Sequence, residues 1–205
     1  MTTVDHQDNY VQKASDKIEL FELLTNKFEI ESALYPGSYK HITPSLFFPI
    51  TVYVNPYEKA KEFFAKRDLI NYIHKNKRYK RKPIIRFHNK DYRENLGEFD
   101  ESFDLLISQY VGFISRDCKR YLKVGGLLLV NNTHGDASMA HLDHQFKLYG
   151  VFYKSNNQYY LTQKNLDKYF IPKKEIEITI EYLEKIKRGI GYKKTGSYYL
   201  FQRIK

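Results

Sequence analysis

The sequence predicts an α/β fold, in which a mostly parallel sheet carries helices on both faces and ends in an antiparallel strand. Between about residues 31 and 136, short apolar runs alternate with segments whose apolar residues recur at helical spacing. The run 127–130 is apolar at every position, as expected of a parallel strand buried on both faces. After residue 136 a hairpin signal and a terminal apolar run replace the alternation, which predicts the antiparallel finish.

A chain of 205 residues is long enough for one well-buried core and short for two. Its composition, 42% hydrophobic and 28% charged, is typical of a globular protein. The sequence contains no internal repeat and no linker-like segment. We therefore expect a single domain over 1–205, with 1–30 as an N-terminal helical extension and 31–205 as the core.

Helices are expected from apolar spacing and from start and stop signals. The extension carries a helix over 14–28, and Thr43-Pro44 begins a short helix that Pro49 ends. Asn55 is predicted to cap a longer helix, with Ala60, Phe63, Phe64, Ile70 and Ile73 on its buried side. Two further helices are expected from Ser115 to Lys123, where Gly125-Gly126 stops the helix, and over 176–188.

Strands are expected wherever a short β-rich run is bounded by turn residues. A hairpin is predicted around Ser155-Asn156-Asn157. The predicted strands are 32–35, 50–54, 83–87, 103–108, 127–130, 146–153, 158–161 and 197–204.

The chain has one cysteine, Cys118, so it cannot form an intrachain disulfide, and a reduced thiol suits a cytoplasmic protein. Residues 1–10 are polar, with no apolar core like that of a signal peptide. No apolar run approaches the roughly 20 residues that span a bilayer. We expect a soluble cytoplasmic protein that makes no membrane contact.

The net charge of +10 favours acidic partners, with nucleic acid first among them. The densest basic run is Lys75 to Lys82, and a solvated loop is the more usual explanation of such a run. A second basic group consists of Lys173, Lys174, Lys185, Lys187, Arg188, Lys193 and Lys194.

The sequence resembles the class I S-adenosylmethionine-dependent methyltransferases, which have a Rossmann-like fold. The order of elements over about 31–205 carries part of the resemblance. The residues Ala33 to Ser38, Asp91-Tyr92, Phe103 to Ser108 and the Gly125-to-Asp136 segment carry the rest. In particular, Phe-Asp-Leu-Leu-Ile-Ser, followed by Tyr-Leu-Lys-Val-Gly-Gly-Leu-Leu-Leu-Val, is similar to the fourth and fifth strands of that family.

The resemblance implies S-adenosylmethionine as cofactor, bound at the carboxyl ends of the strands. After the first strand the family has a glycine-rich turn, and here Gly37 stands alone between Pro36 and Ser38. The family's acidic ribose ligand is replaced by Asn55, which is also explained by a capping role alone. Asp91 matches the position that holds the adenine amino group, and an Asp at such an edge is also explained as a solvated turn former. The cofactor-binding residues that the resemblance implies are Tyr35, Gly37, Ser38, Asn55, Asp91, Tyr92, Ser108 and Gln109.

Methyl transfer is a direct displacement, so the enzyme mainly aligns the reactants and sometimes supplies a base. The resemblance places Tyr110 after the fourth strand, where the methyl group would emerge. It places His134 and Asp136 after the fifth strand, on the same rim, and these three are the candidate catalytic residues. A loop-closing or helix-capping role explains His134 and Asp136 equally well. The acceptor is expected to be a small molecule or a nucleic acid.

Other site classes find less support in the sequence. The glycine motifs of dinucleotide-binding and P-loop proteins are absent, and so is a nucleophile elbow. His141 and His144 lack an obvious third ligand, so no metal site is predicted. The alternative function is that of a catalytically inactive protein with the methyltransferase fold, which binds nucleic acid or a protein through its basic surface.

Overall fold

The computed structural model of the chain describes residues 17–156 and 158–205. The chain divides into two compact units, of which unit 1 ends at Leu96 and unit 2 begins at Gly97. The single domain expected over 1–205 stays a prediction.

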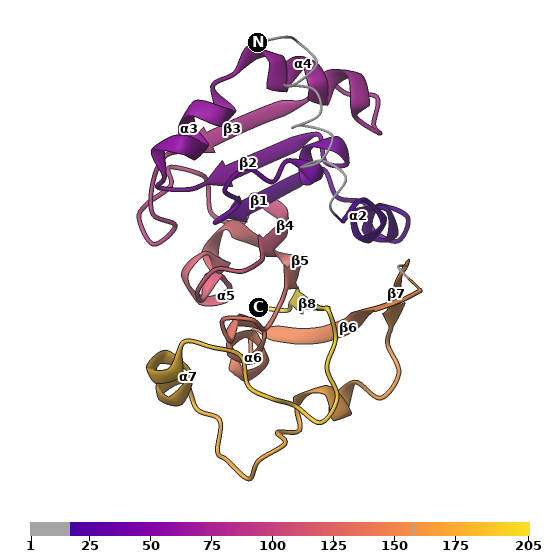
Figure 1. Ribbon diagram of the computed structural model, residues 1–205, viewed down its shortest axis with the longest axis vertical. Helices are drawn as coiled ribbons and strands as arrows, with labels where there is room; N and C mark the ends of the chain where they lie inside the picture. The colour runs from indigo at the N-terminus through magenta and orange to yellow at the C-terminus, as the bar shows by residue number, and fades with distance from the viewer. Residues whose placement is uncertain (1–16, 157) are drawn as a thin grey trace. The chain divides into compact units, whose positions relative to one another are not determined.

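Unit 1 contains a parallel sheet of three strands in the order β3-β2-β1 (Figure 1). The strands are β1 (Ser32–Pro36), β2 (Ile50–Val54) and β3 (Ile84–His88), which confirms the first three predicted strands. Tyr35, Tyr53 and Phe87 lie opposite one another in the register and therefore share one face. Because the strands are parallel, the loops that follow them all leave from the same edge of the sheet.

The helices of unit 1 are shorter than predicted. Within residues 17–96, they are α2 (Ile18–Thr25), the 3₁₀ helix η1 (Thr43–Leu46), α3 (Glu58–Phe64) and α4 (Arg67–Asn76). Residues 14–16 of the first predicted helix lie outside the described residues.

The prediction of a single helix from Asn55 onward is wrong, because two helices, α3 and α4, form in this segment. Lys66 has extended backbone (ψ 126°) and interrupts it. The interruption changes the helical phase, so Leu69 is fully buried and Ile70, predicted to face the core, is 41% exposed.

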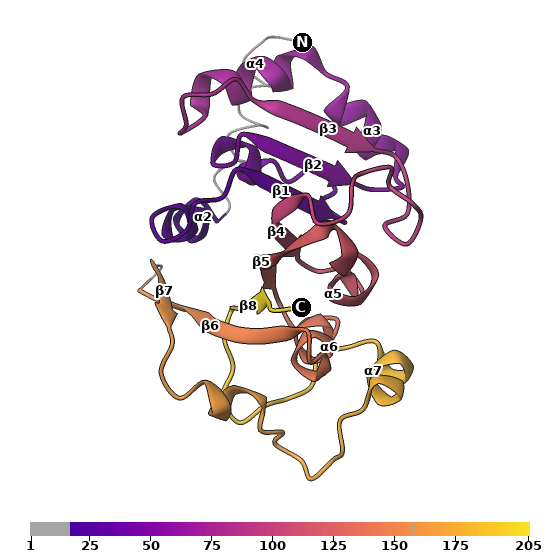
Figure 2. The ribbon, with the colours of Figure 1, turned by 180° about the vertical axis from the view of Figure 1, so that it is seen from behind.

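Unit 2 contains a mixed sheet in the order β4-β5-β8-β6-β7. β4 (Phe103–Ser108) and β5 (Leu122–Val130) are parallel, and β8 (Tyr198–Arg203) is antiparallel to β5. β6 (Phe146–Ser155) and β7 (Gln158–Thr162) form the predicted hairpin, and β6 also pairs antiparallel with β8 (Figure 2). The predicted antiparallel finish is confirmed and comprises three strands.

The helix predicted from Ser115 to Lys123 is wrong. Only a turn of α-helix, α5 (Ile114–Asp117), and the 3₁₀ helix η2 (Lys119–Tyr121) form before β5 begins at Leu122. Gly125, with φ 86°, lies inside β5, where the pairing with β4 changes register between Phe103 and Leu105. The glycine pair therefore makes a bulge in a strand and does not end a helix.

Two α-helices and one 3₁₀ helix follow β5: α6 (Asp136–Leu142), η3 (Leu166–Phe170) and α7 (Ile180–Ile186). α7 is shorter than the predicted helix because Thr179 caps it, accepting the N–H of Tyr182 at 3.1 Å, and Lys187 ends it in left-handed backbone. Cys118 is buried as a free thiol. Within the described ranges, no helix combines the length and apolar character that crossing a bilayer requires.

Candidate functional site

The turn after β1 is closed by Gly37, which has left-handed backbone (φ 69°) that favours glycine. Its N–H donates to the carbonyl oxygen of Val54 at 2.8 Å, so the turn is tied to the end of β2. The next residue, Ser38, is buried, and its hydroxyl has no hydrogen-bond partner among the described residues. A buried hydroxyl without a partner is a place where a bound ligand gains a hydrogen bond.

Tyr35 lies in the same strand but belongs to the core. Its hydroxyl is 3.0 Å from Nδ1 of His41, and its ring lies against those of His41 and Tyr53. Of the candidates around this turn, Gly37 and Ser38 follow the end of β1, and Tyr35 lies within the strand.

Asn55 follows β2 and is buried. Its Oδ1 accepts the N–H of Tyr57 at 3.0 Å, which makes a local turn before α3. The residue that caps α3 is Tyr57, without a side-chain hydrogen bond, so the prediction that Asn55 caps the helix directly is wrong. The physical reason is that Tyr57 has extended backbone (ψ 129°), so the helix begins only at Glu58.

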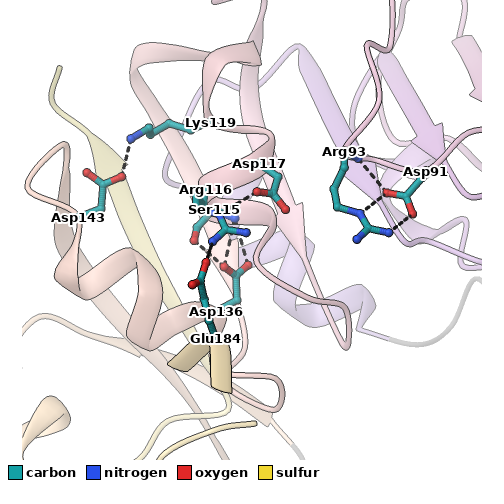
Figure 3. Close-up of polar contacts among 9 residues, drawn as sticks. All are labelled: Asp91, Arg93, Ser115, Arg116, Asp117, Lys119, Asp136, Asp143 and Glu184. Carbon is teal, nitrogen blue, oxygen red and sulfur yellow. Dashed lines mark hydrogen bonds and ion pairs between the residues drawn. The ribbon is translucent and has the colours of Figure 1, made fainter. Parts of the chain in front are cut away.

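Asp91 lies in the loop after β3, and its carboxylate is held by Arg93 (Figure 3). Oδ1 accepts the backbone N–H of Arg93 at 3.0 Å and its Nε at 2.8 Å, and Oδ2 accepts from the guanidinium at 2.7 Å. The bonds from Arg93 lower the pKa of Asp91 to about 2, so the group is ionised at neutral pH. Arg93 also lies over the ring of Tyr92, 5.8 Å from its centroid.

Sequence reasoning missed two exposed aromatic residues in the same loops. Tyr39 follows β1 and Tyr57 follows β2, and their ring centroids are 6.5 Å apart with the rings nearly perpendicular. Nζ of Lys40 is 5.2 Å from the Tyr39 ring. Exposed aromatic rings that meet at the carboxyl edge of a parallel sheet are suited to contact a flat ligand. The one sequence signal for such a pair is the high tyrosine content, 19 of 205 residues.

In unit 2 the two polar candidates Ser108 and Asp136 lie together. Asp136 is the first residue of α6 and is buried, and its Oδ2 accepts the Ser108 hydroxyl at 2.5 Å. Its Oδ1 accepts the hydroxyl of Ser115 at 2.5 Å, and both carboxylate oxygens are within 3.2 Å of the Ser115 N–H. The carboxylate thus joins the end of β4 to the start of α5 and α6. Burial raises the pKa of Asp136 to about 7, although the bonds from Ser108 and Ser115 lower it in part.

Ion pairs hold the helices around this carboxylate (Figure 3). Arg116 in α5 bonds to Asp117 beside it and to Glu184 in α7. Lys119 pairs with Asp143, at the end of α6, at 2.5 Å. These ion pairs have a structural role, and we assign no reactive group among their side chains.

The remaining candidates occupy the loops that leave β4 and β5. Gln109 is buried, and Tyr110 is 59% exposed with left-handed backbone (φ 58°). The N–H of Tyr110 lies 3.5 Å from Oδ1 of Asn131, the first residue after β5. His134 is half-buried, with Nδ1 lacking a partner among the described residues, and the carboxylate of Asp136 bonds to the two serines and not to His134. The roles predicted for these residues stay predictions.

An open pocket of about 430 Å³ lies beside Tyr110, entirely within unit 2. Its wall combines the start of the loop after β5 with the glycine-containing segment before β8. The lining residues are Tyr110, Asn131, Asn132, Thr133, Arg188, Gly189, Ile190, Gly191, Thr195, Gly196, Ser197 and Tyr199. No sequence pattern indicates this pocket, because its two walls are more than fifty residues apart in the chain. In the part of the chain that the structure describes, no group of three or more His, Cys, Asp or Glu side chains is placed to hold a metal ion.

Comparison with known proteins places the fold. No protein-family model and no curated protein matches the sequence. Among solved structures, an S-adenosylmethionine-dependent methyltransferase from Thermotoga maritima matches 99% of this chain and 96% of its own, with 12% identity and a TM-score of 0.50. A protein from Klebsiella pneumoniae, assigned provisionally as an O-methyltransferase, matches 71% of this chain and 77% of its own, with 12% identity and a TM-score of 0.51.

The chain also matches 61% of a protein from Methanococcus maripaludis, with a TM-score of 0.44 and 17% identity. The two stronger matches fall at identities where likeness shows fold alone. The chain therefore has the Rossmann-like α/β fold of the class I S-adenosylmethionine-dependent methyltransferases.

Proposed function

We propose that the chain is an S-adenosylmethionine-dependent methyltransferase whose cofactor is held by the loops after β1, β2 and β3 of unit 1. The observation that carries the proposal is the match of nearly the whole chain to a methyltransferase fold. The residues of unit 1 fit such a group, because the buried hydroxyl of Ser38 lacks a partner among the described residues beside the Gly37 turn.

Each candidate in unit 1 has a stated task in this proposal. Gly37 keeps the first turn free of a side chain, and Ser38 offers its hydroxyl to the cofactor. Oδ1 of Asn55 accepts one N–H, from Tyr57, and retains a lone pair for a ribose hydroxyl. Oδ2 of Asp91 accepts one N–H, from Arg93, and retains a lone pair for the adenine amino group.

The aromatic residues Tyr39, Tyr57 and Tyr92 stand beside these polar groups and would contact the flat base. Tyr35 supports the turn through the hydrogen bond between its hydroxyl and Nδ1 of His41.

When bound, the cofactor supplies a methyl group activated on a sulfonium sulfur. The protein's part is alignment, because direct displacement needs the acceptor atom placed in line. In unit 2, Tyr110 is an exposed aromatic side chain at the pocket and is proposed to orient the acceptor. His134, which follows Thr133 of the pocket wall, is the proposed base.

Asp136 is proposed as a positioning residue. Its carboxylate is enclosed by Ser108 and Ser115 and fixes the end of β4, the strand that leads into Gln109 and Tyr110. Ser108 acts with Asp136 in this role, and Gln109 stays a predicted cofactor contact.

The adenine contact can be tested by calorimetry with S-adenosylhomocysteine and with its deaminated analogue, in which a carbonyl oxygen replaces the amino group. Wild-type protein is expected to prefer the adenosyl compound by about tenfold or more, because a hydrogen bond to a charged group contributes about 1.5–3 kcal/mol. Asp91→Ala should remove the preference by weakening only the adenosyl compound.

Two serine variants serve as a matched pair in the same titration. Ser38→Ala should weaken both compounds, whereas Ser155→Ala, in the exposed end of β6, should leave both unchanged. Equal affinity of wild-type protein for the two compounds would remove Asp91 from the proposed site.

The second candidate function is a binding protein with this fold that lacks catalysis. It is favoured by the engagement of Asn55 and Asp91 with neighbouring residues, and by Lys75, Lys80 and Lys82, which are exposed and make no ion pair within the described residues. Such lysines would bind the phosphates of a nucleic acid.

This candidate predicts salt-sensitive binding of mixed oligonucleotides. Replacing Lys75, Lys80 and Lys82 together with Gln should weaken binding and reduce its salt slope by about three phosphate contacts. Replacing Lys147, Lys154 and Lys164 of unit 2 with Gln is the control of equal charge. Affinity that is unchanged between low and high salt would exclude the electrostatic interaction.

A further inference from the structure

The pocket of unit 2 is of a size that takes a small molecule. Its volume of about 430 Å³ lies within the 300–1,000 Å³ typical of ligand sites. The glycine segment forms one wall and approaches the other closely, since a Cβ on Gly189 would meet the Asn132 carbonyl oxygen at 1.9 Å. The N–H of Gly189 also donates to the Thr133 carbonyl oxygen at 2.9 Å, so the two walls are bonded together.

One buried amide in this pocket presents unused donors. Asn131 is only 6% exposed, and its Oδ1 accepts the N–H of Thr133 at 3.2 Å and faces that of Tyr110 at 3.5 Å. These bonds fix which end of the amide is the oxygen. The Nδ2 group at the other end is buried and has no partner among the described residues. A group with two N–H donors and no acceptor calls for an oxygen from a ligand.

The charge of the lining points the same way. Among the residues that line the pocket, Arg188 is the one charged side chain, and no carboxylate is present. Arg188 is exposed and forms no ion pair with any described residue. A guanidinium binds a carboxylate or a phosphate with two parallel hydrogen bonds.

The other polar groups of the wall are occupied or neutral. Oδ1 of Asn132 accepts from the N–H and the hydroxyl of Ser138, and the Tyr199 hydroxyl accepts the N–H of Gly196. Thr133, Thr195 and Ser197 contribute hydroxyls, which suit a polar ligand of either charge. Arg188 and Nδ2 of Asn131 are therefore the groups that select a charge.

We propose that this pocket binds a small molecule carrying an oxyanion group, which Arg188 and the Asn131 amide recognise, beside the exposed ring of Tyr110. The inference that this molecule is the methyl acceptor rests on the proposed function; binding of the oxyanion itself does not. It narrows the acceptor from any small molecule or nucleic acid to a small molecule with a carboxylate or a phosphate.

The test uses three flat probes on the full chain: 4-hydroxybenzoate, its neutral counterpart 4-hydroxybenzamide, and phenyl phosphate. Calorimetric titration should give wild-type protein an affinity at least tenfold higher for one of the two anions than for the amide. Which anion binds more tightly tells whether the recognised group is a carboxylate or a phosphate. Equal affinity for all three probes, or no binding of either anion at millimolar concentration, would overturn the proposal.

Variants place the bound anion in this pocket. Arg188→Gln should weaken the preferred anion about tenfold and leave the amide unchanged, whereas Lys185→Gln, an exposed cation of α7 outside the lining, should stay within twofold of wild type. Asn131→Asp keeps the acceptor for Tyr110 and Thr133 and replaces the donor group with an oxygen, so it should also weaken the anion. Equal effects of Arg188→Gln and Lys185→Gln would mean that the anion binds elsewhere.

The same preparations titrated with S-adenosylhomocysteine separate this proposal from the proposed function. Cofactor binding without anion binding would refute the pocket alone. Anion binding that depends on Arg188, without cofactor binding, would refute the methyltransferase proposal and leave the oxyanion site standing.

Discussion

At the scale of single residues, protonation of the buried Asp136 carboxylate is expected to affect folding. Burial raises its pKa from 3.8 to about 7. Because the folded state holds the proton more tightly than the unfolded chain, the protonated form favours folding at low pH, and this contribution is lost as the pH rises from about 4 to about 7. The loss amounts to roughly 4 kcal/mol, from about 1.4 kcal/mol per unit of pKa.

Urea unfolding of wild type and Asp136→Asn between pH 4 and 8 checks this prediction. Asn cannot titrate, so the stability of wild type relative to the variant should fall across that range. A stability difference that stays constant, or grows, as the pH rises would show that Asp136 is ionised in the folded protein throughout.

Two glycines in the wall of the unit 2 pocket form a matched pair. A Cβ on Gly189 would meet the Asn132 carbonyl oxygen at 1.9 Å, whereas a Cβ on Gly191 has nothing nearer than Cδ of Lys173 at 3.9 Å. Gly189→Ala should therefore cost about 1–3 kcal/mol, seen as a drop of several degrees in Tm. Gly191→Ala should change Tm little, and similar drops for the two variants would contradict the close contact between the walls.

At the scale of elements, the break between α3 and α4 determines which side chains of α4 are buried. Leu69 is fully buried and Ile70 is 41% exposed. Leu69→Ala should cost about 2–5 kcal/mol, as removal of a buried leucine does, and Ile70→Ala less than about 1 kcal/mol. Chemical denaturation of the two variants measures both values. A larger cost for Ile70→Ala than for Leu69→Ala would instead support the single continuous helix that the sequence alone predicts.

The strands were the most predictable elements. Apolar runs such as 50–54 and 103–108 are short, β-rich and bounded by turn residues, and the structure confirms them. The helix ends were less predictable because tertiary contacts decide them. Ser115 bonds to Asp136, which is distant in sequence, and Gly125-Gly126 serves a bulge where the sequence suggests a helix stop.

At the scale of the whole molecule, the fold class followed from the order of elements, since alternating strands and helices leave few topologies. Candidate site residues could be proposed from the sequence only where they follow a strand along the chain, as Gly37, Asn55 and Asp91 do, and their roles stay predictions. Partners distant in sequence were not foreseeable. Arg188 and the loop after β5 line the same pocket only because the chain folds back on itself. In the same way, the Asp136 carboxylate accepts a hydrogen bond from Ser108, 28 residues earlier in the chain.

Folding likewise pairs part of the basic side chains with acidic ones. Within the Lys75-to-Lys82 run, Arg78 pairs with Glu22 and Arg81 pairs with Glu31 at 2.7 Å. In the sequence these arginines belong to one cationic run, whereas in the folded unit each forms an ion pair with a glutamate.

The central claim, that the chain binds S-adenosylmethionine, is tested most directly by the change in Tm on adding that compound or S-adenosylhomocysteine, with ATP and NAD as controls. A ligand that binds only the folded state stabilises it by about 2.7 kcal/mol at a hundred times its Kd, which corresponds to a rise in Tm of several degrees. We predict such a rise with the two sulfur compounds and none with the controls. An unchanged Tm at millimolar concentrations of both sulfur compounds would contradict the claim.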